Sequence, residues 1–387
     1  MNMKKKLFRI TTVPISLEKL LENQLRFMTA HYDVTIISSD KSHLEKVGQS
    51  QQTATHAVEM TRKITPFQDL KSMWNLYKFF KKEQPFIVHS HTPKAGIVGM
   101  MAAKLAGVPN RLHTVAGLPL LEAKGAKRKI LDVVEKLTYA CATKVYPNSR
   151  GLLEIIKENQ YCPDAKLKVL ANGSSNGINT SHFDPQLFSE QQNEELQMEL
   201  GFSEGDFVFI FVGRLVKDKG INELIAAFEK LHNQYPNAKL LLVGDYETDL
   251  DPLLPETLAK IQNSRFVVHT GFMYDVRPYL NISNALVFPT YREGFPNVVL
   301  QAGAMGLPCI VTDINGCNEI IEEGKNGLII PVKDSDAIFK AMQRLYSDKN
   351  LYISLQNAAR QSIVSRYEQK VVWEAILAEY KKLEQHV

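Results

Sequence analysis

The sequence predicts an α/β protein made of two domains, each built on a parallel, Rossmann-like sheet. The chain has 387 residues, which is too long for one typical domain and suits two of ordinary size. In both halves, short apolar runs typical of buried strands alternate with helical stretches, the pattern expected of βαβ units. A polar stretch at 185–205, rich in Gln, Asn and Glu, separates the halves. We therefore expect a first domain at 1–184 and a second at 185–369, followed by a helix at 370–387.

The expected strands follow the apolar runs of each half. In the first half they cover 7–13, 34–39, 87–92, 111–115, 144–148 and 168–172. In the second half they cover 207–213, 239–245, 266–272, 285–290, 308–312 and 328–330. Helical patterns occupy 193–200, 276–282 and 351–384, and a further helix is expected to begin at Pro296, where the missing N–H costs nothing.

Composition indicates a globular protein of a reducing compartment. The chain is 44% hydrophobic and 23% charged, which is not the balance of a disordered chain. The apolar run at 97–103 ends at Lys104, so it is too short to span a membrane. The basic start imitates a signal peptide, but Arg9, Pro14 and Glu18 interrupt any apolar segment, and we expect a strand there. The four cysteines are Cys141, Cys162, Cys309 and Cys317. Their spacing is neither that of metal ligands nor that of a disulfide framework, which favours the cytoplasm.

Charge is divided unevenly along the chain. Residues 1–190 carry 27 Lys and Arg against 16 Asp and Glu, a net charge of +11, whereas the remaining residues carry 19 against 26, a net charge of −7. A basic half joined to an acidic half indicates an anionic partner for the first half. Two basic stretches, 71–82 and 120–129, suit an anionic bilayer surface, and the first includes Trp74, Tyr77 and Phe80. The alternative is that both are ordinary solvated faces with some aromatic side chains in the core. Because no nucleic-acid motif accompanies the charge, we expect no nucleic-acid partner.

The segment 291–313 is the strongest functional signal in the sequence. It turns at Glu293 and Gly294 directly after an expected strand and then enters the helix that begins at Pro296. The first-turn amides of that helix, beside a glycine that allows close backbone approach, form a place for phosphate at the carboxyl end of a parallel strand. Glu293 and Gln301 lie about two helical turns apart and can both reach hydroxyls of a sugar and a ribose. The alternative is that Glu293 caps the helix and Gln301 is a solvated polar position.

A second signal follows the strand at 207–213. Gly213 and Arg214 end this strand, and Lys219 comes just before the next helix. Two cations at a strand end can neutralise a diphosphate and support the departure of a nucleotide, because they act where negative charge builds up. The alternative is that both cations form surface salt bridges.

These motifs carry a family resemblance. Glu-Gly-Phe-Pro-Asn-x-x-x-Gln at 293–301, Gly-Leu-Pro-x-x-x-Thr-Asp at 306–313 and the Gly-Arg…Lys-Gly pattern at 213–220 resemble the signature of retaining, nucleotide-sugar-dependent glycosyltransferases of the GT-B type. The similarity is greatest to the bacterial branch that extends lipid-linked sugars in capsule, O-antigen and glycan assembly. That family has an acidic residue at the position of Gln301, and the uncharged amide is expected to hold a ribose more weakly.

The resemblance implies a fold, an activity and a donor site. It implies two Rossmann-like domains facing across a cleft, with the closing helix packed back onto the first domain. It also implies transfer from a nucleotide-diphosphate sugar, with UDP as the expected nucleotide, to a lipid-linked saccharide in surface polysaccharide biosynthesis, with retention of the anomer. Glu293 then orients the donor sugar, while Arg214 and Lys219 act on the diphosphate. The other expected donor contacts are Gly213, Gly271, Phe272, Gly294, Phe295, Pro296, Asn297 and Gln301.

Acceptor-side candidates lie in the basic half. His91, Thr92 and Lys94 join a strand to a helix that Thr92 is expected to cap, and Lys94 with the exposed amides makes an anion site. In a lipid-linked acceptor, this anion is the polyprenyl diphosphate. His113 lies three residues before Ala116, which stands where the family usually has a histidine that reaches the donor sugar. Ala116 leads to the hypothesis of a 6-deoxy donor sugar, and the alternative is that it only packs.

No metal or other cofactor is expected. Asp249 and Asp251 have the Asp-x-Asp form of metal-dependent transferases, but they lie in an acidic loop beside Pro252. The stretch 11–16 is not a G-x-G-x-x-G loop, which argues against dinucleotide binding by the first domain. We expect a cytoplasmic protein at the inner face of the membrane. Two rivals stay open: a nucleotide-sugar epimerase of the same fold, and a non-catalytic binding protein.

Overall fold

The computed structural model describes residues 4–61, 63–247, 249 and 251–385, which form two compact units. Unit 1 contains the chain as far as Asn176 together with the chain from Gln369, and unit 2 spans Gly177–Glu368. The terminal residues 1–3 and 386–387, which the sequence prediction assigned to the first domain and the closing helix, lie outside the described residues.

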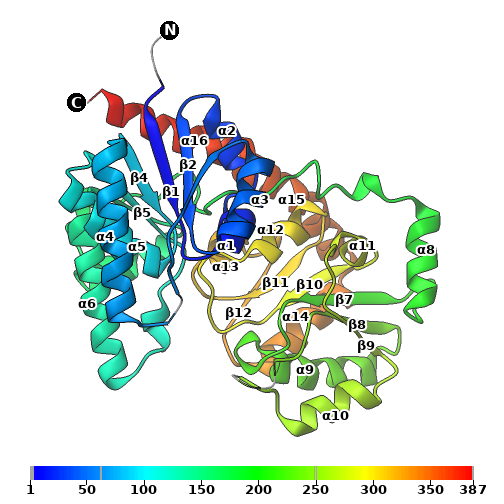
Figure 1. Ribbon diagram of the computed structural model, residues 1–387. Coiled ribbons are helices and arrows are strands. Elements are labelled where there is room, and N and C mark those ends of the chain that lie inside the picture. Colours follow the sequence, from blue (N-terminus) through cyan, green and yellow to red (C-terminus); the bar gives the residue numbers. More distant parts are fainter. Residues whose placement is uncertain (1–3, 62, 248, 250, 386–387) are drawn as a thin grey trace. The chain divides into compact units, whose positions relative to one another are not determined.

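Unit 1 is built on a six-stranded parallel sheet in the order β3-β2-β1-β4-β5-β6. Figure 1 labels four of these strands, β1, β2, β4 and β5. Its strands are β1 (Lys6–Ile10), β2 (Asp33–Ser38), β3 (Ala54–Ala57), β4 (Ile87–Ser90), β5 (Asn110–Val115) and β6 (Lys144–Pro147). Its helices are α1 (Pro14–Leu20), α2 (Gln24–Thr29), α3 (Lys41–Gln51), α4 (Pro66–Glu83), α5 (Pro93–Ala106), α6 (Gly125–Cys141), α7 (Arg150–Glu158) and α16 (Gln369–Glu384).

Unit 2 repeats this plan with a second six-stranded parallel sheet, in the order β12-β11-β10-β7-β8-β9. Its strands are β7 (Phe207–Val212), β8 (Ala238–Val243), β9 (Val267–Gly271), β10 (Ala285–Phe288), β11 (Cys309–Thr312) and β12 (Gly327–Ile330). Its helices are α8 (Glu190–Glu199), α9 (Ile221–Gln234), α10 (Pro255–Asn263), α11 (Arg277–Asn281), α12 (Asn297–Ala304), α13 (Cys317–Ile320), α14 (Ser335–Ser347) and α15 (Lys349–Tyr367). Numbered within each unit, both sheets have the strand order 3-2-1-4-5-6 of a Rossmann fold.

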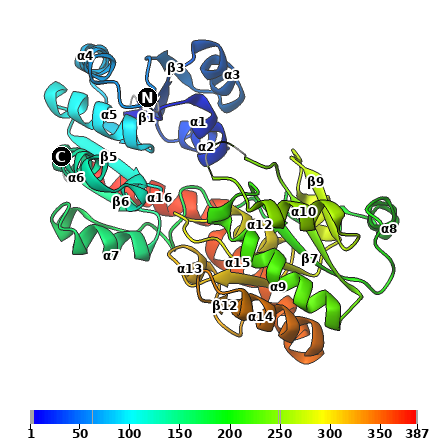
Figure 2. The same ribbon diagram turned by 90° about the horizontal axis from the view of Figure 1, so that it is seen from below.

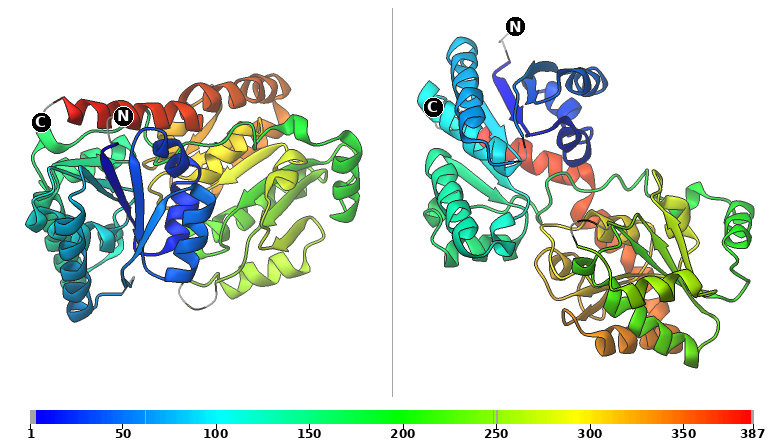
Figure 3. Two further views of the ribbon diagram at one scale, coloured as in Figure 1. Left: turned by 45° about the horizontal axis from the view of Figure 1, so that its top comes forward. Right: turned by 60° about the horizontal axis from the view of Figure 1, so that its bottom comes forward.

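Buried apolar side chains cover both faces of the unit 1 sheet. On one face, Phe8 and Ile10 pack with residues of α4, α5, α6 and α7. On the other face, Leu7 and Ile36 pack with residues of α1, α2, α3 and α16. The helix α16, red in Figure 3, therefore forms part of the unit 1 core.

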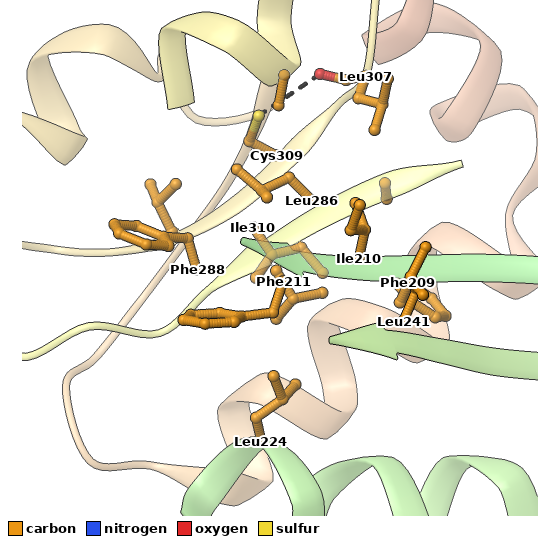
Figure 4. Close-up of a cluster of buried hydrophobic side chains, with 14 of the residues drawn as sticks. Phe209, Ile210, Phe211, Leu224, Leu241, Leu286, Phe288, Leu307, Cys309 and Ile310 are labelled. Atoms are coloured by element: carbon orange, nitrogen blue, oxygen red, sulfur yellow. Dashed lines mark hydrogen bonds between the residues drawn. The ribbon is translucent and has the colours of Figure 1, made fainter. Parts of the chain in front are cut away.

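The core of unit 2 is one continuous cluster centred on β7. Figure 4 shows Phe209 and Phe211 of β7 with Leu241 of β8 and Leu286 of β10. The rings of Phe211 and Phe288 are stacked, with centroids 5.8 Å apart. Parallel strands covered by helices on both faces read as continuous apolar runs, and this is why the sequence shows them so clearly.

The structure differs from the expected strands in two places: one expected strand is absent, and one strand was not expected. The stretch 168–172 is not a strand, and next to it an isolated bridge joins Leu167 to Val145 of β6. The strand β3 was not predicted because it lies at the sheet edge, contains Thr55 and His56, and has no buried residue. Its sequence therefore lacks an apolar run.

The unit boundary also differs from the expected division at 184/185. Ile178 and Phe183 belong to the unit 2 core, and the Ile178 amide donates to the Tyr367 carbonyl. These contacts explain why the chain enters unit 2 before the polar stretch at 185–205. The predicted helix at 351–384 is two helices, α15 and α16, which meet at Glu368.

Candidate functional site

The candidate site lies in unit 2, at the carboxyl ends of β7 and β10. These neighbouring strands are the point where the strand order reverses, since β7 continues to β8 on one side and pairs with β10 on the other. Open α/β sheets bind ligands at this switch point. Gly213 and Arg214 follow β7 directly, and Glu293 follows β10 after a short turn.

Close backbone packing at this edge requires glycine. A Cβ added to Gly244, which follows β8, would lie 1.9 Å from the Gly213 carbonyl oxygen, and Gly244 has φ +140°. A Cβ on Gly220 would lie 2.2 Å from the Pro289 carbonyl oxygen, with φ +72°. The loops after β7, β8 and β10 therefore pack backbone against backbone at these two glycines.

Lys219 and Glu293 meet across the switch point. The Lys219 Nζ forms an ion pair with Glu293 Oε1, and the two side chains are 16% and 18% exposed. The Asn315 side-chain amide donates to the Glu293 carbonyl, which holds the turn after β10. A cation and a carboxylate predicted from separate motifs are thus direct neighbours, each with further donor or acceptor capacity.

Arg214 is also paired, but it is more exposed. Its guanidinium binds the Glu247 carboxylate, and its side chain is 57% exposed. Next to it, Asp218 accepts from Arg292 at 2.5 Å. Burial raises the pKa of Asp218. The described site therefore alternates cations and carboxylates, so an incoming anion can compete with carboxylates for the cations.

The helix α12 begins one residue later than expected. Asn297 is its first residue, and Pro296 is the N-cap. Phe295 packs against the Tyr367 ring, with centroids 5.5 Å apart, and Asn297 is exposed. Gln301 is half-buried on the same helix. A Cβ on Gly316 would lie 2.8 Å from the Gly294 carbonyl, so this glycine allows the loop after β11 to pack on the turn.

An exposed aromatic pair lies beyond β9. Phe272 is 59% exposed and Tyr274 is 98% exposed, and their rings meet edge to face at 5.1 Å. The Phe272 amide donates to Asp245 at 3.0 Å, which fixes the turn after Gly271. Aromatic rings this exposed can pack against a planar ligand.

The equivalent edge of unit 1 is filled by a buried polar network. The Arg9 guanidinium donates to His91 Nε2 at 3.0 Å, to the Tyr380 hydroxyl at 2.9 Å and to Gln24 Oε1 at 2.5 Å. His89 bonds the same Tyr380 hydroxyl at 2.5 Å. Among the described residues, no carboxylate is paired with Arg9. Burial lowers the pKa of Arg9 and lowers the pKa of both His89 and His91 well below the ordinary value.

The remaining acceptor-side candidates, Thr92, Lys94 and His113, each contact a different partner in unit 1. Thr92 is the N-cap of α5, but its hydroxyl contacts Thr12 and makes no capping bond to the helix. Lys94 forms an ion pair with Asp69. His113 is 3% exposed and bonds Ser90 Oγ at 2.8 Å, and burial lowers its pKa to about 4.

Several site residues were missed by sequence reasoning. Glu247 and Asp218 pair with cations of the site, Tyr274 extends the aromatic pair, and Arg9 joins Tyr380 in unit 1. Gly244 was also missed, although the sequence carries a signal for it: like Gly213, it directly follows an apolar run that forms a strand. The ion pairs had no such signal, because each joins residues from different loops.

The described residues provide no evident cation site and no membrane span. Within the described ranges, no group of three or more His, Cys, Asp or Glu side chains is placed to hold a metal ion. Asp251 instead accepts from the Asp218 amide at 2.7 Å. In the same part of the chain, no helix is long and apolar enough to cross a membrane. All four cysteines are free.

The chain has two Rossmann-like units, and the switch point of the second has cations and the start of a helix. These features define a class of two-domain α/β proteins suited to nucleotide diphosphates. A family model described as "Glycosyl transferases group 1" matches residues 192–362, and one described as "Glycosyl transferase 4-like" matches residues 19–149. The chain is 35% identical over 376 residues to the capsular polysaccharide biosynthesis glycosyltransferase CapM of Staphylococcus aureus, covering 97% of this chain and 96% of that protein. The chain therefore belongs to the group 1 glycosyl transferases, as the sequence predicted.

Further comparisons agree with this family. The chain is 30% identical over 342 residues to the UDP-Gal:alpha-D-GlcNAc-diphosphoundecaprenol alpha-1,3-galactosyltransferase of Escherichia coli, covering 87% of this chain and 85% of that enzyme. Its fold matches the crystal structure of Anabaena HepE in complex with UDP and glucose, with a TM-score of 0.81, 17% identity, and coverage of 98% of this chain and 100% of that one. A glycosyltransferase from Rickettsia africae gives a TM-score of 0.82 at 18% identity, with both chains fully covered. These matches confirm the predicted GT-B fold class.

Proposed function

We propose that this glycosyltransferase moves a hexose-type sugar from a UDP-sugar to a polyprenyl-diphosphate-linked saccharide during assembly of a surface polysaccharide. The observation that carries the proposal is the Lys219–Glu293 pair at the β7/β10 switch point, in a chain of this family. The names of the relatives support the substrate classes, since one of them uses UDP-Gal and a diphosphoundecaprenol acceptor.

The proposed donor chemistry is an exchange of partners. Arg214 and Lys219 leave their carboxylates in part to hold the diphosphate, and the start of α12 adds backbone amides. Glu293 is thereby released to accept hydrogen bonds from donor-sugar hydroxyls. The aromatic side chains of Phe272 and Tyr274 supply a surface for the uracil. As the bond to the sugar breaks, negative charge grows on the diphosphate, and the cations stabilise it.

The proposed reaction retains the anomeric configuration and needs no metal ion. Retention is proposed on the family resemblance, with the acceptor hydroxyl attacking from the side that the nucleotide leaves. Two side-chain cations carry out the charge neutralisation that a divalent ion performs elsewhere. Chelation with EDTA should therefore leave the transfer rate unchanged, and loss of the rate that Mg²⁺ or Mn²⁺ restores would contradict this part.

One assay separates the proposal from its rivals. The purified protein is incubated with labelled UDP-sugars, with and without a polyprenyl-diphosphate-linked GlcNAc, and the product anomer is read by NMR. Acceptor-dependent transfer supports the proposal. Isomerisation of the donor without acceptor would indicate an epimerase, and binding without turnover would indicate a silent homologue. Comparing 6-hydroxy and 6-deoxy donors tests the Ala116 hypothesis, which a clear preference for the 6-hydroxy donor defeats.

The proposed location is the cytoplasmic face of the membrane, as a peripheral protein. On α4, Lys71, Lys78 and Trp74 are exposed, whereas Phe80 is buried in the core. The basic stretches therefore keep their cations and one large aromatic side chain at the surface. Co-sedimentation with anionic vesicles tests this, and equal binding to neutral vesicles in high salt would contradict an electrostatic contact.

A further inference from the structure

Unit 1 contains an apolar groove between α4, α5 and α6, helices that lie side by side in Figures 1 and 2. The groove encloses about 290 Å³, near the small end of ligand sites, which span roughly 300–1,000 Å³. Leu70 of α4, Met101 of α5 and Ile130 of α6 line its walls. Nothing in the donor chemistry uses this groove, because the donor site lies wholly in unit 2.

The apolar walls of the groove are unusually exposed. Leu70 is 61% exposed, Ile64 is 59% exposed and Ile130 is 50% exposed. Contiguous exposed apolar surface of this kind marks a binding site more often than an ordinary surface. Three such residues, from two helices and the loop before α4, would gain most from an apolar ligand that removes them from water.

The groove has one charged end. Among the described residues that line it, Asp69 and Lys94 are the polar ones, and they form an ion pair with side chains 23% and 11% exposed. Lys94 lies in the first turn of α5, a helix of 14 residues. Its ammonium group has three donors, so it can keep Asp69 and also bind an anion. The helices α4 and α6 each carry four Lys or Arg residues against two Asp or Glu, so both helices that flank the groove are basic.

We propose that this groove binds an isoprenoid segment of the acceptor lipid, with the lipid diphosphate directed toward Lys94. The inference rests on the proposed function and extends it to the lipid part of the acceptor. A groove that is apolar along its walls and cationic at one end is complementary to an amphiphile with an apolar tail and an anionic head. The lining continues inward from the exposed walls to Val98, which is buried, and Met101, which is half-buried. A single chain can reach these inner side chains, whereas a flat bilayer surface contacts only the exposed rim. The small volume means that the groove holds only part of a polyprenyl chain.

The first test measures binding without catalysis. Farnesyl diphosphate and inorganic diphosphate are titrated by calorimetry into the full-length protein and into the double variant Leu70→Gln/Ile130→Gln. We expect the variant to bind farnesyl diphosphate at least about tenfold more weakly, because polar side chains replace apolar contacts, with little change for inorganic diphosphate. The matched control is Leu105→Gln, since Leu105 is 59% exposed on α5 but does not line the groove. Equal farnesyl affinity in wild type and double variant, or an equal loss in the control, overturns the proposal.

The second test uses transfer and separates the two proposals. With a long polyprenyl acceptor, the double variant should have a raised KM, and the rise should shrink as the lipid is shortened. A rise that does not depend on lipid length overturns the groove assignment. Absence of transfer to every lipid acceptor, together with groove-dependent farnesyl binding, would overturn the proposed function and leave the groove assignment supported. Two further outcomes of the double variant would overturn the proposal if farnesyl binding is unaltered. Weaker binding to anionic vesicles without polyprenyl lipid would assign the groove to a bilayer, and a changed oligomeric state would assign it to a second copy of the chain.

Discussion

In unit 1, the side chains at the ends of β1 and β4 are buried and bonded to one another, whereas in unit 2 those after β7 and β10 are partly exposed and paired as ions. Both edges are the switch points of sheets with the same strand order. Arg9 and His91 are 0% and 3% exposed, while Lys219 is 16% exposed and Arg214 is 57% exposed.

The difference separates an edge whose polar side chains are closed by the chain itself from one whose cations have partly exposed partners. In unit 1, Tyr380 of α16 enters the network around Arg9, so the chain itself supplies the partners that a ligand would otherwise supply. In unit 2, glycines let the loops pack backbone against backbone, and the cations are held by the partly exposed carboxylates of Glu247 and Glu293. A polar edge is therefore ready for a ligand only where its own partners are exchangeable.

Removal of Arg9 should give the largest effect, on the stability of unit 1. Arg9→Ala leaves a cavity and removes a partner from each of three buried polar groups, so we expect a loss of about 3–5 kcal/mol. Both tryptophans, Trp74 and Trp373, lie in unit 1, so urea unfolding followed by tryptophan fluorescence reports this unit. The control Arg26→Ala removes an exposed arginine of α2 and should change stability by less than about 0.5 kcal/mol. Equal midpoints for Arg9→Ala and wild type would show that the network does not stabilise the unit.

Removal of Lys219 should act on transfer with little effect on folding. Lys219→Ala is expected to lower kcat by about 10²–10³, or about 3–4 kcal/mol, which is the typical loss of one charge-stabilising donor in an active site. The matched control is Lys230→Ala, whose surface pair with Asp336 is 53% and 69% exposed; this variant should keep its rate within about twofold. If both variants transfer sugar equally well, the switch point of unit 2 is not the donor site.

Substitution of Gly244 should destabilise unit 2 alone. In Gly244→Ala, the new Cβ would meet the Gly213 carbonyl at 1.9 Å in a backbone with φ +140°, and we expect a cost of about 2–3 kcal/mol. Gly205→Ala is the control, because Gly205 has φ +89° but no atom within 4 Å of an added Cβ; it should cost about 1 kcal/mol. The loss should be visible in far-UV circular dichroism and weaker in tryptophan fluorescence. A Gly244→Ala protein as stable as Gly205→Ala would contradict the role of close backbone packing.

The same contrast explains what could be predicted from sequence. The strands were predictable because buried parallel strands are apolar runs, and Glu293 and Lys219 stand in short local motifs. Their pairing was not predictable, since it joins loops after β7 and β10. The network of unit 1 was even less accessible, because Arg9 and Tyr380 are 371 residues apart in the chain. Local pattern identifies elements and motif residues, whereas their partners depend on the tertiary fold.

The smallest effect for a single side chain is expected from a change of pH, which should lower the stability of unit 1 through its buried histidines. His89, His91 and His113 are buried as neutral side chains, with pKa values below the ordinary value of about 6.5 and about 4 for His113. Below about pH 6.5 the unfolded chain binds protons at these positions and the folded chain does not. The stability that depends on the neutral rings is thus complete above about pH 6.5 and is lost as the pH falls toward 4, by about 1.4 kcal/mol for each histidine per pH unit.

Urea unfolding at pH 7.5 and pH 5.5 checks this expectation, because the fluorescence transition reports unit 1. Its midpoint should fall at pH 5.5, and the fall should be smaller in His113→Gln, which removes one of the buried rings. Burial raises the pKa of Glu135 in the same unit to about 7, so this carboxyl takes up a proton in the folded state and offsets part of the fall. In the His113→Gln variant the glutamine amide can still form a hydrogen bond with Ser90 Oγ, which His113 contacts at 2.8 Å. The substitution therefore removes the titrating ring and keeps a polar partner for Ser90. An unchanged midpoint between the two pH values would mean that the rings take up protons in the folded state. The histidines near Arg9 would then not be the buried, neutral side chains that distinguish this edge from that of unit 2.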